Sequence, residues 1–281
     1  MARSDTIKGA SPARLAKKKG GLGETTRFLL ILFLSALILR SFIVAPFSIP
    51  SGSMLPRMMI GDYLFVAKWP YGFSRFSLPF GLFDFDGRIW GGAAERGDVV
   101  VFRYPGRGDE DYVKRVIGVP GDKVEVRGGA IFLNDKPVPR VRIADYLMPV
   151  TANSPCRYVA PELTRVVTDE QGQNFCAYPR YRETLPGGRS HDVLDQMPGS
   201  PADDTTVYTV PAGHYFVMGD NRDDSQDSRF PREAGGVGYL PADHLIGRAL
   251  ITFFSTDGSA EWLKPWTWVS AARWDRIGGT F

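Results

Sequence analysis

The sequence is organised around the stretch IPSGSM at residues 49–54, which begins just after a long apolar run. Two hydroxyl groups separated by one glycine and entered through a proline are typical of a tight, exposed turn. Ser53 is the candidate nucleophile in this turn. Because a serine hydroxyl attacks only when a base removes its proton and donors stabilise the oxyanion, the rest of the chain must supply both. The alternative interpretation is a plain linker between a membrane helix and a folded domain.

The apolar run predicts one membrane span over residues 27–47. Residues 28–39 are apolar except for Ser35, and the run resumes at Phe42 after two polar residues. A helix of twenty residues is about 30 Å long, which is the thickness of the hydrocarbon layer of a bilayer. A cleaved export signal is the alternative, but the proline that would follow a cut after Ala45 disfavours it. We therefore expect an uncleaved anchor.

Positive charge is concentrated at the start of the chain. Residues 1–27 carry seven basic and two acidic side chains, a net charge of +5, whereas the whole chain carries +3. The slightly acidic remainder has no basic stripe interleaved with aromatic residues, which argues against a nucleic-acid partner. A basic segment before an apolar span indicates a cytoplasmic N-terminus. We therefore expect residues 1–26 to be a cytoplasmic tail and the chain beyond the span to lie outside the cytoplasm.

The chain after the span predicts a mainly β protein. Short runs of Val, Ile, Tyr and Phe separated by Gly and Pro are typical of strands and turns, and helical periodicity is missing. Residues 129–210 are more polar, richer in loops and proline, and hold both cysteines. We therefore expect a membrane-anchored, mostly antiparallel β catalytic core of residues 48–128 and 211–281. Residues 129–210 would form an inserted β subdomain.

Lys114 is the candidate base. It lies in a run of β-branched residues, 111–119, that ends in a Pro-Gly-Asp turn and predicts a strand. A lysine in a strand commonly lies on the solvated face, and that interpretation stays open from the residues alone. On the inner face, burial without a carboxylate partner would lower its pKa from about 10.4 toward neutrality. It could then accept a proton from Ser53.

Other kinds of site are disfavoured. None of the three histidines stands in the context of a Ser-His-Asp triad, such as Gly-x-Ser-x-Gly. The acidic loop at residues 219–229 lacks the alternating ligands of a calcium loop. Cys156 and Cys176 lack the paired histidines of a zinc site, and two cysteines outside the cytoplasm predict a disulfide. We therefore expect no metal and no cofactor.

Four motifs follow one another in a fixed order. They are PSGSMLP at residues 50–56, RGDVVVF at 96–102, YVKR at 112–115 and GDNRDDSQDSR at 219–229. In this order, behind an apolar span, they closely resemble the successive boxes of the bacterial type I signal peptidase family, also called leader peptidases. The resemblance implies a membrane-bound serine endopeptidase that cleaves N-terminal signal peptides from exported preproteins. Cleavage would follow small residues, Ala-x-Ala, and would use a Ser-Lys dyad.

The resemblance implies a role for individual residues. Ser53 would attack the scissile carbonyl, and Lys114 would take its proton. The Ser51 hydroxyl and the Ser53 backbone N–H would form the oxyanion hole, while Ser225 would orient the Lys114 amine. The substrate would lie extended, as an added strand, over shallow apolar pockets. The residues implied to line these pockets are Phe47, Ile49, Met54, Met58, Leu64, Val101, Tyr112 and Val113.

The loop at residues 219–229 would be held by Asp227 and Arg229. The sequence departs from the family pattern at Arg57, where a threonine is usual, and at Asp224, where an asparagine is commoner. Neither departure touches a proposed catalytic group.

The resemblance also implies a location and partners. The chain would be a single-pass protein of the bacterial inner membrane, with a cytoplasmic N-terminus and a periplasmic catalytic domain. Its partners would be preprotein signal peptides and the lipid bilayer, without nucleic acid or metal. Two alternatives stay open: a maturation peptidase dedicated to a single substrate, and a non-enzymatic, anchored, β-rich assembly module. The module would tolerate loss of Ser53 or Lys114, whereas an enzyme would not.

Overall fold

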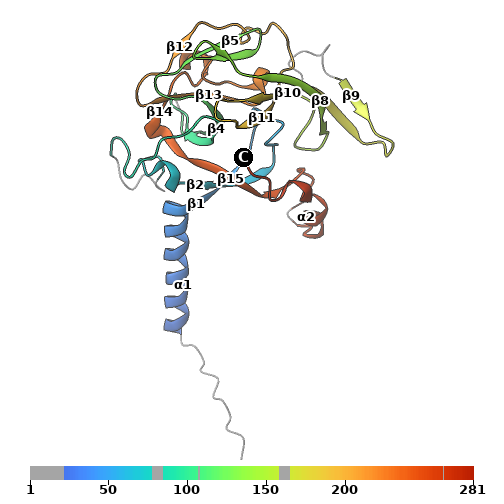
Figure 1. The fold of residues 1–281 in the computed structure, drawn as a ribbon. Helices are drawn as coiled ribbons and strands as arrows, with labels where there is room; N and C mark the ends of the chain where they lie inside the picture. Colours follow the sequence, from blue (N-terminus) through green and yellow to red (C-terminus); the bar gives the residue numbers. More distant parts are fainter. Residues whose placement is uncertain (1–21, 78–84, 107, 158–164, 262) are drawn as a thin grey trace, which may run out of the picture. The chain divides into compact units, whose positions relative to one another are not determined.

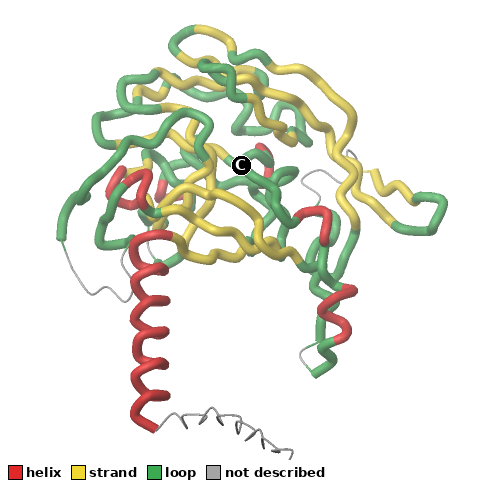
Figure 2. Tube along the Cα trace, turned by 60° about the horizontal axis from the view of Figure 1, so that its bottom comes forward, coloured by secondary structure: helices red, strands yellow, loops and turns green. Residues whose placement is uncertain are grey.

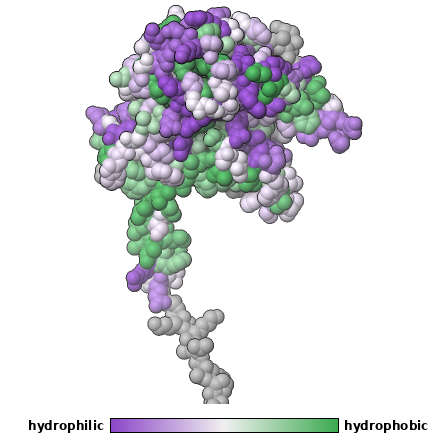
Figure 3. All heavy atoms as spheres, in the orientation of Figure 1, coloured by the Kyte–Doolittle hydropathy of each residue, from purple (hydrophilic) through white to green (hydrophobic). Residues whose placement is uncertain are grey.

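The computed structural model describes residues 22–77, 85–106, 108–157, 165–261 and 263–281, and the chain divides into two units, residues 1–38 and 39–281. In the first unit, α1 (Leu22–Ile38) presents exposed apolar side chains along most of its length (Figure 3). Together with the next turn it forms an apolar helical segment, Gly23–Ile43, whose length and mean hydropathy of 2.0 suffice to cross a membrane.

The helical segment differs at both ends from residues 27–47, the limits predicted for the span. The helix already begins at Leu22, within the predicted tail, most of which lies outside the described residues. After a π-helical turn, Leu39–Ile43, residues Val44–Ser48 form strand β1. An apolar run cannot by itself distinguish helix from strand. Here residues 44–48 form a strand because β1 pairs antiparallel with β2 (Asp62–Ala67).

A seven-stranded antiparallel sheet forms the centre of the larger unit (Figure 1), in the order β1-β2-β15-β3-β4-β13-β14. Its strands come from both ends of the unit, so the segments before and after the middle of the chain meet in one sheet. This confirms the predicted mostly antiparallel β fold. The remaining bounds are β3 Val99–Arg103, β4 Asp111–Gly118, β13 His214–Met218, β14 Leu240–Pro241 and β15 Leu245–Ser255.

Two four-stranded sheets complete the β structure. The first, β12-β5-β6-β7, contains β5 Lys123–Arg127, β6 Ala130–Leu133, β7 Lys136–Pro137 and β12 Tyr208–Thr209. The second contains β8 Arg140–Pro149, β9 Arg165–Thr168, β10 Asn174–Thr184 and β11 Ser190–Leu194. Most of these strands lie within residues 129–210. Because β5 pairs with β6 across residue 129, that segment shares a sheet with the chain before it.

Helices are short in the described part of the larger unit, as Figure 2 shows in red. They are α2 Trp266–Ser270 and the 3₁₀ turns η2 Trp69–Tyr71, η5 Arg222–Asp224, η6 Arg232–Ala234, η7 Ala242–His244 and η8 Trp274–Arg276. Cys156 and Cys176 form a disulfide with Cα atoms 5.6 Å apart, which ties the segment after β8 to β10.

Candidate active site

Ser53 lies in the turn that follows β1, and backbone hydrogen bonds hold this turn at both ends. The Ile49 N–H donates to the carbonyl of Asp62, 2.9 Å away. The Asn221 backbone N–H donates to the Ser53 carbonyl at 3.0 Å, and the Asn221 side-chain amide donates to the Gly52 carbonyl at 3.1 Å. The turn is therefore fixed between the start of β2 and the loop at residues 219–229, which we call the acidic loop.

Lys114 lies on β4 with its amine buried against the turn. Its Nζ donates to Ser53 Oγ at 2.8 Å and to the Val113 carbonyl at 3.1 Å, and the residue is 4% exposed. Burial lowers the pKa of Lys114 to about 8, although the negative charges of Asp227 and Asp220 act in the opposite direction. A lysine with this pKa is roughly one tenth unprotonated at pH 7. It can therefore accept a proton from the serine.

Ser51 places a second hydroxyl beside the first. Its Oγ lies 3.4 Å from Ser53 Oγ, and its side chain is exposed toward solvent. The intervening Gly52 is buried, and a Cβ there would lie 3.2 Å from the Arg157 side chain and 3.3 Å from Leu55. The small residue lets neighbouring side chains approach the turn while both hydroxyls face the same space.

Ser225 hydrogen-bonds to a carboxylate in this structure. It does not form the predicted hydrogen bond to the Lys114 amine. Ser225 Oγ donates to Asp227 Oδ2 at 2.8 Å. A Cβ added at Gly219 would lie 2.3 Å from Ser225 Oγ and 2.6 Å from the Ser53 carbonyl oxygen. Only a glycine permits this approach, so Ser225 is brought close to the nucleophile turn but hydrogen-bonds away from Lys114.

Asp227 and Arg229 hold the acidic loop from inside. Arg229 donates to both carboxylate oxygens of Asp227 at 2.9 Å, and the Gly219 N–H donates to Asp227 Oδ2 at 3.0 Å. Burial alone would raise the pKa of Asp227, but the Arg229 guanidinium and these hydrogen bonds outweigh it and hold the pKa below its usual range. The carboxylate is therefore charged at neutral pH and fixes the loop's shape.

Two further buried ion pairs support the loop, and sequence reasoning missed both. Arg115 donates to Asp220 through Nε at 2.8 Å and through a second nitrogen at 2.6 Å. Arg222 donates to both oxygens of Glu183 on β10, one of them at 2.8 Å. A charged residue gives no sign in the sequence of which partner it will meet across the fold. Only the charge density of the acidic loop hinted that partners were needed.

An open cleft of about 960 Å³ runs past the Ser53 and Lys114 side chains. Six of the eight residues predicted to contact substrate line it, namely Phe47, Ile49, Met54, Val101, Tyr112 and Val113. Met58 and Leu64 do not, since both are fully buried in the core beneath. Phe76 and Ile246 line the cleft without having been predicted, because each is far in sequence from the recognised motifs.

Lys68 is a second buried lysine on this cleft that the sequence analysis missed. It is 5% exposed, and burial, together with the Arg40 charge, lowers its pKa to about 8. Its amine donates to the Ser77 carbonyl. Lys114, in contrast, donates to the serine hydroxyl, so Lys114 is the lysine with the geometry of a base.

A serine hydroxyl bonded to a buried amine of lowered pKa, beside an open apolar cleft, has the features of a serine hydrolase that uses a lysine as its base. Comparison with known proteins leads to the same class. The family model described as signal peptidase, peptidase S26, matches residues 22–254. The chain therefore belongs to the signal peptidase family, peptidase S26, and is a serine peptidase by class.

Similarity to individual relatives extends over most of the chain. The chain is 34% identical over 265 residues to the signal peptidase I of Rickettsia prowazekii, and the match covers 86% of this chain and 87% of the relative. It is 36% identical to the signal peptidase I of Rickettsia canadensis, with the same coverage. Among solved structures, it is similar to a signal peptidase I of Enterococcus faecalis, with 25% identity over 56% of this chain and 96% of that chain, at a TM-score of 0.29.

Proposed function

We propose that this protein is a membrane-anchored serine endopeptidase that cleaves signal peptides from exported preproteins. The observation that carries the proposal is the 2.8 Å hydrogen bond between Lys114 Nζ and Ser53 Oγ at the edge of the cleft. Because Lys114 is buried and has no ion-pair partner among the described residues, its amine can be neutral near physiological pH. Family membership supports the substrate class.

The groups of the site act in a fixed order. The neutral Lys114 amine accepts the Ser53 proton as Oγ attacks the scissile carbonyl carbon. The oxyanion that forms is stabilised by the Ser53 backbone N–H and the Ser51 hydroxyl. The Lys114 ammonium then gives its proton to the leaving amine, which breaks the peptide bond and leaves an ester on Ser53. Water, deprotonated by the same lysine, hydrolyses the ester and restores the serine.

The shape of the cleft supports an extended substrate with small side chains. Residues 45–51 border the cleft from β1 and the turn, and residues 110–114 border it from β4. A peptide laid between them as an added strand would present alternate side chains to the apolar lining. Shallow pockets there would favour Ala-x-Ala before the cut. Ser225, Asp227 and Arg229 would hold the acidic loop beside the nucleophile turn.

The apolar segment and the surface of the larger unit support an attachment to lipid. Ser53 follows the last residue of that segment, Ile43, by ten positions. Apolar side chains also gather on the face formed by β1, β2 and β15 (Figure 3), where Tyr63 packs against Phe254 at 5.8 Å between ring centroids. We place the span in the bacterial inner membrane, with the N-terminus cytoplasmic and the catalytic unit on the periplasmic side. Residues 129–210 would be an insertion carried by this unit.

Cleavage of a purified precursor in detergent tests the proposal. The full chain should cut a precursor after the second alanine of an Ala-x-Ala site, as read by sequencing the new N-terminus. Ser53→Ala should lower kcat/KM by about 10⁴-fold or more, because the nucleophile is lost. Ser270→Ala, at an exposed serine of α2, is the matched control and should cut like the parent. Equal cleavage by Ser53→Ala would overturn the proposal. Processing of only one among several unrelated precursors would indicate a dedicated maturation peptidase.

A further inference from the structure

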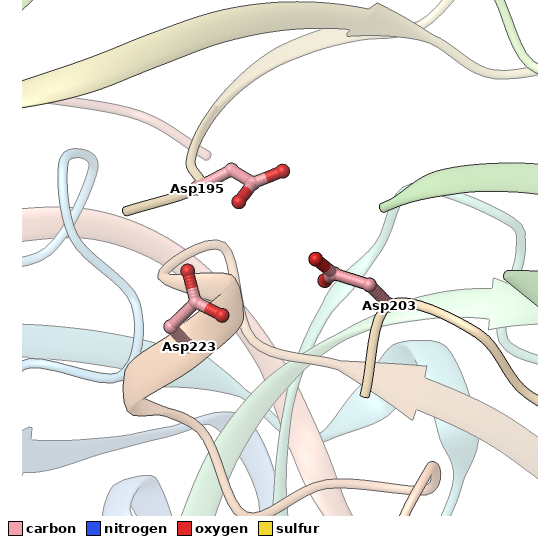
Figure 4. A group of neighbouring side chains, drawn as sticks. All are labelled: Asp195, Asp203 and Asp223. Atoms are coloured by element: carbon pink, nitrogen blue, oxygen red, sulfur yellow. The ribbon is translucent and has the colours of Figure 1, made fainter. Parts of the chain in front are cut away.

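Three carboxylates outside the catalytic cleft converge on one space. Asp195 follows β11, Asp203 lies in the turn before β12, and Asp223 belongs to η5 of the acidic loop. One oxygen from each lies within 4.8 Å of the other two. Figure 4 shows the three carboxyl groups pointing toward one another from three separate segments. Like charges brought this close repel unless a cation or a proton separates them.

The cluster also contains buried oxygens without hydrogen-bond donors. In the described part of the chain, five buried side-chain nitrogen or oxygen atoms have no partner, and Asp195 Oδ1 and Asp223 Oδ1 are two of them. The Asp195 side chain is 9% exposed, so water is largely excluded from it. A buried carboxylate oxygen that accepts no hydrogen bond pays an uncompensated desolvation cost. A bound cation would remove that cost for both residues.

Backbone N–H groups hold one oxygen of Asp203 and one oxygen of Asp223 in place. The Gly199 and Ser200 N–H groups donate to Asp203 Oδ2 at 2.7 and 3.0 Å. The N–H groups of Gln196 and Met197 donate to Asp223 Oδ2 at 2.6 and 2.9 Å. Asp203 and Asp223 are thus fixed by the backbone before any ligand arrives, and Asp195 is held by the Arg140 side chain. A site of this kind binds without the cost of ordering its ligands.

Charge within the cluster matches a divalent ion. Three carboxylates carry three negative charges, and the Arg140 guanidinium, which donates to Asp195 and also lies 3.8 Å from Glu183, offsets at most one of them. At least two negative charges remain, which one divalent cation would balance. Calcium takes carboxylate oxygens at about 2.3–2.6 Å, so two oxygens on one ion are separated by at most about 5.2 Å. The observed separation falls within this limit.

We propose that Asp195, Asp203 and Asp223 form a binding site for one Ca²⁺ ion. The site joins the segment after β11 to the acidic loop, which also carries Ser225 and Asp227. The ion would act on the shape and stability of this loop and would take no part in peptide cleavage. This inference does not rest on the proposed function, since it follows from the carboxylates alone.

Calcium binding to the full chain in detergent tests the inference directly. Isothermal titration with CaCl₂, after EDTA treatment and dialysis, should give about one ion per chain with a dissociation constant on the order of 10⁻⁴–10⁻³ M. Addition of 10 mM CaCl₂ should raise the midpoint of thermal unfolding by a few degrees. Asp223→Asn keeps an oxygen for the Gln196 and Met197 N–H groups but removes the charge, and should weaken binding about tenfold or more.

Calcium binding by two further variants distinguishes a specific site from nonspecific attraction of Ca²⁺ to acidic surface residues. Asp204→Asn removes one charge at the exposed neighbour of the cluster and should bind calcium like the parent. Asp195→Asn should weaken binding as Asp223→Asn does, and if it fails to fold, Asp223→Asn decides alone. Absence of saturable binding up to 10 mM, or equal affinity of Asp223→Asn and the parent, would overturn the inference. Equal affinity for Mg²⁺ would overturn the assignment to calcium.

Discussion

Lys114 and Arg115 are neighbours on β4, and both are buried cations with opposite surroundings. Successive residues of a strand point to opposite faces, so the two side chains enter different regions of the larger unit. Lys114 meets the Ser53 hydroxyl and a carbonyl, whereas Arg115 meets both oxygens of Asp220. One region lowers the pKa of its cation and readies it for chemistry. The other pairs its cation with a buried carboxylate, which supports the acidic loop.

The difference has an energetic side that depends on pH. The pKa of Lys114 falls from 10.5 to about 8 on folding. At about 1.4 kcal/mol per unit, this shift costs roughly 3 kcal/mol of stability at pH 7. Between the two pKa values the unfolded chain binds more protons than the folded chain, so this cost shrinks as the pH rises.

The largest expected effect is the loss of activity on replacing Lys114. Lys114→Met keeps much of the buried volume but removes the base, and should lower kcat/KM by about 10⁴-fold or more. The free energy of unfolding at pH 7 should hold or rise, because a buried amine no longer has to be desolvated. Precursor cleavage and urea unfolding measure the two effects. Lys68→Met replaces the second buried lysine of the cleft and should still cleave the precursor. If Lys68→Met lost cleavage and Lys114→Met kept it, Lys68 and not Lys114 would be the base.

Replacing the neighbouring arginine should affect stability first. Arg115→Met leaves the Asp220 carboxylate buried without its partner and should lower the free energy of unfolding by about 3–5 kcal/mol. The double variant Arg115→Met with Asp220→Leu removes both charges and should recover most of this loss. Urea unfolding of the three proteins provides the comparison. A double variant as unstable as the single one would mean that packing, and not the unpaired charge, causes the loss.

A smaller effect is expected at Ser51, which belongs to the first of the two regions. Ser51→Ala removes one proposed oxyanion donor and should lower kcat by about 10²–10³-fold. KM should change little, because the interaction forms in the transition state. Ser51→Thr keeps the hydroxyl and is the matched comparison. A kcat for Ser51→Ala equal to that of the parent would exclude Ser51 from the oxyanion hole.

The smallest effect is that of pH on the intact enzyme. With the pKa of Lys114 at about 8, the neutral fraction of its amine rises about tenfold between pH 7 and pH 9. The rate constant kcat/KM should rise in proportion, with half of its maximum near pH 8. Initial rates of precursor cleavage at fixed ionic strength measure this. A flat profile above pH 6 would contradict the comparison between the two cations.

The sequence predicted the parts of the molecule whose chemistry is local. Ser53 and Lys114 stand in short motifs, and the short runs of Val, Ile, Tyr and Phe between Gly and Pro indicated a mainly β fold. Features that depend on contacts between distant residues were missed or wrong. The end of the helical segment is set by the pairing of β1 with β2, and Met58 lies beneath the cleft. The bond from Ser225 to Asp227 likewise depends on how the acidic loop closes.

The carboxylate cluster shows the same limit more sharply. The acidic loop does not match the calcium-loop motif, whose ligands all lie in one segment. The three carboxylates that converge come from residues 195, 203 and 223, and only the last belongs to that loop. No spacing rule covers ligands brought together by the fold. A metal site was therefore not expected from the residues alone.

Direct titration of Lys114 tests the central claim most closely. NMR spectra of the full chain in detergent, with ¹³C at the lysine ε position, follow each amine through pH, and Lys114→Met identifies the resonance that disappears. Lys68→Met identifies the other buried lysine in the same way. The account predicts a pKa of about 8 for Lys114. A pKa near the ordinary lysine value of about 10.4 would mean that the amine is charged at neutral pH and cannot act as the base.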